Sequence, residues 1–181
     1  FFMVLYSTLP MLWGQIDGEQ SLNDLSRIWL NFPALAGHFW FMYPLISLYL
    51  FIPVISPWLS KATAKEERFF IILFLVSTCI PYLNRFCGEV WGQCFWNEYH
   101  MLWYFSGYLG YLVLAHYIRV HLTWNRSRRL SVGIVLMVVG ALWTIYSFYV
   151  QAVPGQIIST PELEIGWAFC TINCVLLTAG T

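Results

Sequence analysis

Six side chains beside two apolar segments could handle protons or bind a polar ligand. An imidazole changes its protonation state near neutral pH, a carboxylate can accept a proton, and tryptophan and tyrosine offer apolar faces with polar edges. We therefore take these residues as candidates for the mouth of a substrate site. The candidates are His38, Trp40, Tyr43, Tyr49, Glu98 and His100. The alternative is that such side chains only lie among lipid headgroups at the ends of helices.

A second group of candidates is cationic and occupies one short stretch between two apolar segments. A guanidinium group is always charged and binds phosphate oxygens in a two-pronged geometry, so this stretch could hold an anionic cofactor. The candidate residues are Arg119, Arg126, Arg128 and Arg129. The other interpretation is that these arginines only orient the chain in a membrane. Two nearby histidines, His116 and His121, are expected to lie at the interface without a further role.

The cysteines do not indicate a metal centre. Cys87 and Cys94 share a loop and could form a disulfide in an oxidising compartment, but the spacing is equally compatible with two cysteines that only pack. Cys170 and Cys174 lie one helical turn apart, which indicates helix packing. No set of Cys and His residues has the spacing of a four-ligand zinc site, so we expect no metal.

The elements that must position these residues follow from composition. Of 181 residues, 59% are hydrophobic and only 10% are charged, whereas soluble domains carry about a quarter charged residues. The chain is therefore predicted to be all-α, a polytopic bundle of transmembrane helices surrounded by lipid. Nine basic and nine acidic residues cancel, which gives no indication of a nucleic-acid partner. The chain begins and ends inside apolar runs, so we interpret it as a fragment of a larger bundle.

Apolar segments long enough to cross a membrane define the expected helices. A crossing needs about 20 residues. The segments are a partial one over 1–14, four over 38–56, 69–84, 101–119 and 131–151, and a truncated one over 165–181. Residues 21–32 space their apolar side chains three or four apart, which is typical of an amphipathic helix lying in the interface, although an ordinary loop fits equally well.

The loops between these segments predict the orientation. Residues 57–68 and 119–129 hold seven of the nine Lys and Arg residues. Two crossings separate the two loops, so both lie on one side, and an excess of Lys and Arg marks the cytoplasmic side. The loops over 15–37, 85–100 and 152–164 then lie on the outer side.

The segment from Gly37 to Pro53, Gly-His-Phe-Trp-Phe-Met-Tyr-Pro-Leu-Ile-Ser-Leu-Tyr-Leu-Phe-Ile-Pro, resembles a hallmark of membrane-bound acyltransferase family 3. The matching residues are His38, Trp40, Phe41, Tyr49, Leu50 and Pro53. The stretch from Trp103 to Tyr111 is similar to the family's next signature, an aromatic and glycine-rich helix. Another branch has two glutamates where this chain has Leu45 and Ile46, so no role of those glutamates transfers.

The resemblance implies an acyltransferase of the bacterial cytoplasmic (inner) membrane. Such an enzyme moves an acyl group, usually acetyl from acetyl-CoA, to a hydroxyl of a cell-surface glycan or a lipid-linked sugar. The family's arginine-and-histidine motif would lie upstream of Phe1, so the catalytic base is expected outside residues 1–181. Two other classes stay open, a glycan or lipid transporter and a structural subunit. Transporters often contain paired broken helices in related halves, and the sequence contains no internal repeat.

The orientation can be tested by labelling single cysteines with a membrane-impermeant thiol reagent on intact cells. In a full-length protein without native cysteines, Lys61→Cys and Arg128→Cys should stay unlabelled until the cells are opened, because both lie in the cytoplasmic loops. Arg27→Cys, in an outer loop, is the positive control. Labelling of positions 61 and 128 from outside would overturn the predicted topology.

Overall fold

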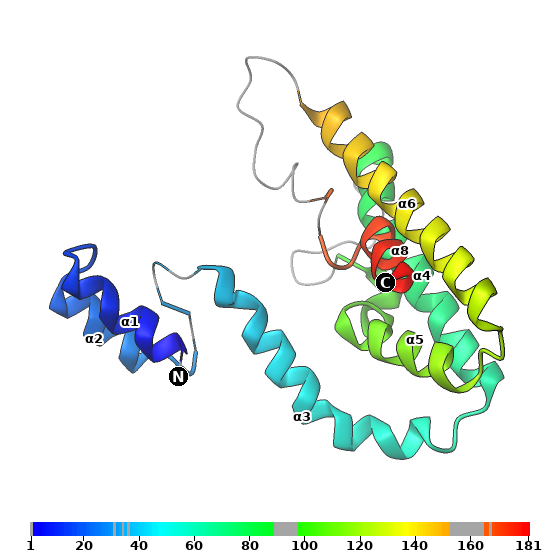
Figure 1. Cartoon of the computed structure of the whole chain (residues 1–181), viewed down its shortest axis with the longest axis horizontal. Helices are drawn as coiled ribbons and strands as arrows, with labels where there is room; N and C mark the ends of the chain where they lie inside the picture. The colour runs from blue at the N-terminus through cyan, green and yellow to red at the C-terminus, as the bar shows by residue number, and fades with distance from the viewer. Residues whose placement is uncertain are drawn as a thin grey trace. The chain divides into compact units, whose positions relative to one another are not determined.

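A computed structural model of the chain describes residues 2–30, 32–33, 35, 37–88, 98–152, 165–166 and 168–181, with only the backbone of His38. Every regular element among these residues is a helix, so the predicted all-α fold is confirmed. The chain forms two compact units, Phe1–Ile55 and Ser56–Thr181 (Figure 1).

In the first unit, α1 (Phe2–Leu12) and α2 (Gly18–Ser26) lie side by side (Figure 1). The hydroxyl of Ser21 donates to the backbone carbonyl of Ser7 at 2.7 Å, and both serines are buried. Asp17 begins α2 by accepting a hydrogen bond from the backbone N–H of Gln20 at 2.7 Å. The amphipathic helix expected over 21–32 therefore begins earlier, with Asp17 as its N-cap, and it ends before residue 27.

The first unit continues into a long apolar helix. A 3₁₀ turn, η1 (Gly37–Phe41), leads into α3 (Met42–Leu59), which runs across the boundary between the units. Only Ile55 of α3 is buried within the chain. A helix that is apolar on all sides and this exposed must be covered by lipid or by other protein.

The second unit contains α4 (Ala64–Cys87), η2 (His100–Phe105), α5 (Tyr108–Val120), α6 (Arg126–Gln151) and α8 (Ile172–Gly180). Three segments of the described chain are long and apolar enough to cross a membrane: Phe39–Leu59, Ala64–Cys87 and Arg126–Gln151. The prediction of a membrane protein is supported by these segments, and α4 and α6 extend beyond the expected ranges 69–84 and 131–151 by including charged first turns.

The segment expected as one crossing over 101–119 is instead interrupted. The 3₁₀ helix η2 ends at Phe105, and Gly107 has a φ of 84°, a left-handed conformation that stops a right-handed helix and that glycine adopts without strain. The 13 residues of α5 are about 20 Å long, which is shorter than the hydrocarbon core. Likewise, the segment 165–181 becomes helical only from Ile172.

Glycines let the helices of the second unit approach closely. A Cβ at Gly140 of α6 would lie 2.8 Å from the backbone oxygen of Asn173 in α8. A Cβ at Gly110 of α5 would overlap the ring of Phe74 in α4, which is fully buried. Close packing over small residues is a main source of helix association in lipid, where the hydrophobic effect between helices is absent.

Replacing Gly110 tests this packing. Gly110→Ala should lower the free energy of unfolding by about 1–3 kcal/mol, because the added methyl group overlaps the Phe74 ring. The measurement is reversible unfolding of the full-length protein in bicelles. Phe74→Leu in the same chain should recover part of the loss, since the two positions are coupled. Gly18→Ala, at an open position, is the control, and a Gly110→Ala protein as stable as the wild type would contradict the arrangement.

Candidate functional site

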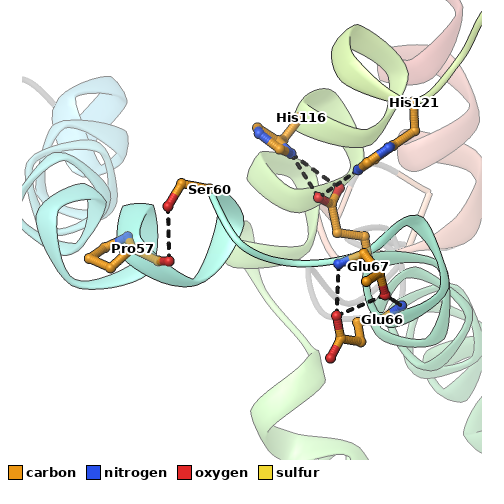
Figure 2. Close-up of polar contacts among 7 residues, drawn as sticks. Pro57, Ser60, Glu66, Glu67, His116 and His121 are labelled. Atoms are coloured by element: carbon orange, nitrogen blue, oxygen red, sulfur yellow. Dashed lines mark hydrogen bonds and ion pairs between the residues drawn. The ribbon is translucent and has the colours of Figure 1, made fainter.

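One end of the second unit holds a cluster of three ionisable side chains, here called the Glu–His cluster: Glu67, His116 and His121 (Figure 2). Oε1 of Glu67 lies 3.0 Å from Nδ1 of His116 and 3.1 Å from Nε2 of His121, and Oε2 lies 3.1 Å from Nδ1 of His116. The carboxylate of Glu67 is fully buried, whereas the two rings are 27% and 22% exposed. A carboxylate removed from water needs such partners, because it would otherwise be strongly destabilised.

The first turn of α4 directs Glu67 into this cluster. Thr63 and Glu66 form a reciprocal cap, in which the carboxylate of Glu66 accepts from the backbone N–H of Thr63 at 2.7 Å. Glu66 is exposed, and the next residue, Glu67, points to the other side of the helix toward both imidazoles (Figure 2).

The end of α5 supplies both histidines. His116 lies within the helix, and His121 follows its last residue, Val120, with its backbone N–H bonded to Tyr117. His121 caps the helix and keeps helical backbone angles, so the two histidines project about 140° apart around the helix axis, and their rings reach the Glu67 carboxylate from two directions. Both histidines therefore contact a buried carboxylate, a contact that the sequence analysis did not predict.

The four candidate arginines lie at the same end of the second unit and are all exposed: Arg119, Arg126, Arg128 and Arg129. The guanidinium of Arg128 lies over the ring of Trp124 at 4.5 Å, and that of Arg129 donates to the backbone carbonyl of Leu122. These contacts hold two of the charges near the first turn of α6. Arg68 of α4 adds a fifth cation here, donating to the hydroxyl of Tyr117 at 3.1 Å.

A cavity of about 580 Å³ contains Glu98 of the substrate-mouth candidates. The other lining residues are Tyr99, Trp103, Ser106, Gly107, Phe169 and Cys170. His100, at the start of η2, has a φ of 50°, an uncommon left-handed conformation for a residue other than glycine.

Contacts around α5 fix the level of this cavity along α4. The ring of Tyr111 lies 5.3 Å from that of Phe74, midway along α4, and its hydroxyl donates to the backbone carbonyl of Phe169. The ring of Phe105 likewise lies 5.2 Å from Phe70. The cavity therefore lies level with the middle of α4, and Glu98 and His100 do not sit at the mouth of a complete crossing helix as expected.

The remaining mouth candidates belong to the first unit. Trp40 and Tyr49 are exposed, and the hydroxyl of Tyr43 donates to the backbone carbonyl of Ile28 at 2.7 Å. The side chain of His38 lies outside the described part of the structure. The six candidates are thus divided between the two units, Phe1–Ile55 and Ser56–Thr181.

A second, mostly apolar cavity of about 660 Å³ lies between the last turns of α4 and α6. A polar network forms at its inner side: the hydroxyl of Tyr82 donates to Oδ1 of Asn173 at 2.9 Å, and Asn173 donates to Thr144 at 2.9 Å and to the carbonyl of Gly166 at 2.8 Å. The open disulfide question concerns this end of α4, but Cys94 lies outside the described residues.

Comparison with known proteins gives one family. A family model described as an acyltransferase domain matches residues 1–180, which is nearly the whole chain. No curated protein and no solved structure matches the chain.

Proposed function

The chain belongs to membrane-bound acyltransferase family 3, and on that basis we propose that it is an integral-membrane O-acyltransferase. In this proposal it transfers an acyl group, usually acetyl, from acyl-CoA to a hydroxyl of a cell-surface glycan or a lipid-linked sugar in the bacterial inner membrane. The observation that carries the proposal is the family match over residues 1–180.

The reaction needs a base and a held thioester. The hydroxyl oxygen attacks the thioester carbonyl carbon, the carbon–sulfur bond breaks, and coenzyme A leaves as a thiol after taking up a proton. A sugar hydroxyl is a weak nucleophile at neutral pH, so a base must remove its proton during the attack. We expect that base upstream of Phe1, where the family's arginine-and-histidine motif would lie.

The exposed arginines support a donor site at the end where α5 stops and α6 starts. Coenzyme A carries several phosphate charges, and guanidinium groups bind phosphate oxygens strongly. Arg128 is held against Trp124, whereas Arg119 and Arg126 are exposed on the flanking helices. In the predicted orientation this end faces the cytoplasm, where coenzyme A is available.

The aromatic cavity supports an acceptor site at mid-depth. Trp103 and Tyr99 offer flat apolar faces against a sugar ring, and Glu98 can accept hydrogen bonds from hydroxyls. Because the cavity lies level with the middle of α4, donor and acceptor could meet within the bundle instead of at one surface. Separately from this cavity, the family resemblance implies an acceptor role for the residues of the Gly37 to Pro53 segment, with His38 first.

One observation favours a second candidate, a glycan or lipid transporter. The break between η2 and α5 at Gly107 is the kind of discontinuity that transporters use at their binding sites. The two functions differ in whether a thioester is consumed.

The decisive assay uses the full-length protein in proteoliposomes with acetyl-CoA and an acceptor glycan. We expect coenzyme A release that depends on the acceptor, and Arg126→Gln should raise the KM for acetyl-CoA about 10-fold with little change in kcat, because one charged phosphate contact is lost. Arg27→Gln, an exposed arginine of the first unit, is the matched control. Movement of intact glycan without thioester consumption would favour the transporter.

His38→Ala tests the acceptor side. The variant should transfer acyl groups at least about 100-fold more slowly, because a proton-handling or orienting group is lost, while its insertion into the membrane stays normal. The measurements are initial rates and the protease protection pattern of membrane vesicles. Wild-type rates in the His38→Ala variant would contradict this role and indicate that His38 only lies among lipid headgroups.

A further inference from the structure

We propose that the Glu–His cluster of Glu67, His116 and His121 binds one divalent transition-metal cation of the zinc class. The inference is independent of acyl transfer and departs from the expectation of no metal, which considered only four-ligand spacings of Cys and His along the sequence.

The donor atoms are the ones such a cation uses. Two imidazole nitrogens and one carboxylate oxygen, with a fourth position left for water, form one of the common protein sites for Zn²⁺. The same set binds Fe²⁺ in other proteins, so the chemistry selects borderline cations over Mg²⁺ or Ca²⁺, which prefer oxygen ligands only.

Two of the three distances between donor atoms are close to those of a ligand shell. One donor atom from each residue lies within 4.8 Å of the others, and the two nitrogen-to-Oε1 distances are 3.0 and 3.1 Å. Around a tetrahedral ion with bonds of about 2.0–2.1 Å, neighbouring donor atoms lie about 3.3 Å apart. The two nitrogen-to-oxygen distances are close to this spacing, whereas the two imidazole nitrogens lie up to 4.8 Å apart, so the rings would have to approach each other by up to about 1.5 Å for a cation to enter. It would replace the hydrogen bonds from the imidazoles, whose binding nitrogens must lose their protons.

The burial of the Glu67 carboxylate favours binding of a positive charge at this site. The Glu67 carboxylate is fully buried, and among the described residues no lysine or arginine pairs with it. Arg68, its neighbour in sequence, donates instead to the Tyr117 hydroxyl. A buried negative charge is stabilised by a nearby cation, and the partial exposure of both rings provides an entry path and room for a water ligand.

The competing state is a cluster without metal, in which both imidazoles donate hydrogen bonds to the carboxylate. That state satisfies the same atoms, so only metal binding separates the two. A bound cation would tie the first turn of α4 to the end of α5, beside the arginines of the proposed donor site.

The test uses full-length protein in detergent, purified with a tag that contains no histidine and stripped with a chelator. Calorimetry with Zn²⁺ should give one equivalent per chain. Co²⁺ in its place should give the strong visible bands of a four-coordinate ion without a thiolate charge-transfer band. If the wild-type protein binds no metal, or if its Co²⁺ spectrum contains a thiolate band, the proposal is overturned. This result does not depend on whether the protein is an active acyltransferase.

Variants identify the ligands. Glu67→Gln, His116→Gln and His121→Gln should each raise the Zn²⁺ dissociation constant at least about 100-fold, since even the loss of an outer partner commonly costs 10–100-fold. Two controls should bind as the wild type does: Glu66→Gln, the exposed carboxylate one residue away, and His100→Gln. Circular dichroism and gel filtration show whether each variant is folded. Where a variant is misfolded, its affinity is disregarded and the Co²⁺ spectrum of the wild-type protein tests the proposal. Unchanged affinity in a folded Glu67→Gln protein would also overturn the assignment.

Discussion

The arrangement of the second unit depends on one constraint: polar groups inside an apolar bundle have no water to bind and must find partners on other helices. Glu67 meets this requirement at one end through two imidazoles of the neighbouring helix. Asn173 meets it near the other end, where its amide joins α8 to Tyr82 of α4 and Thr144 of α6. Each polar group therefore fixes which helices pack together and how far one is shifted along the other. Aliphatic side chains cannot fix this, because one can replace another in the same contact.

Glycines that let neighbouring helix backbones approach closely also fix how the helices pack. In α6 and α8, Gly133 and Gly180 face each other, and Gly140 faces the chain at Asn173, so two helices of very different length lie in contact along one side. In α4 and α5 the ring of Phe74 occupies the space that a side chain at position 110 would need. These contacts place the break at Gly107, and with it the aromatic cavity, level with the middle of α4.

The sequence predicted the features that depend on local composition. Apolar runs located α3, α4 and α6, and the family resemblance, which rested on the segment from Gly37 to Pro53 and the stretch from Trp103 to Tyr111, was confirmed by the match over residues 1–180. The break at Gly107 was missed because hydropathy continues through it; the helix is interrupted by the extended backbone of Ser106 and the positive φ of Gly107. The Glu–His cluster was missed for a different reason. It joins Glu67 to residues 49 and 54 positions away, and a spacing of five between the two histidines is not that of one helix face, so no periodic pattern indicates the cluster.

Helix α3 carries most of the segment that resembles the family, yet within this chain it buries only Ile55. Because few contacts within the chain fix its position, the tilt and rotation of α3 depend on the bilayer thickness and on whatever packs against it. Three of the residues that match the family pattern, Tyr49, Leu50 and Pro53, are exposed on this surface, so the lipid or the helix that covers α3 lies directly against them.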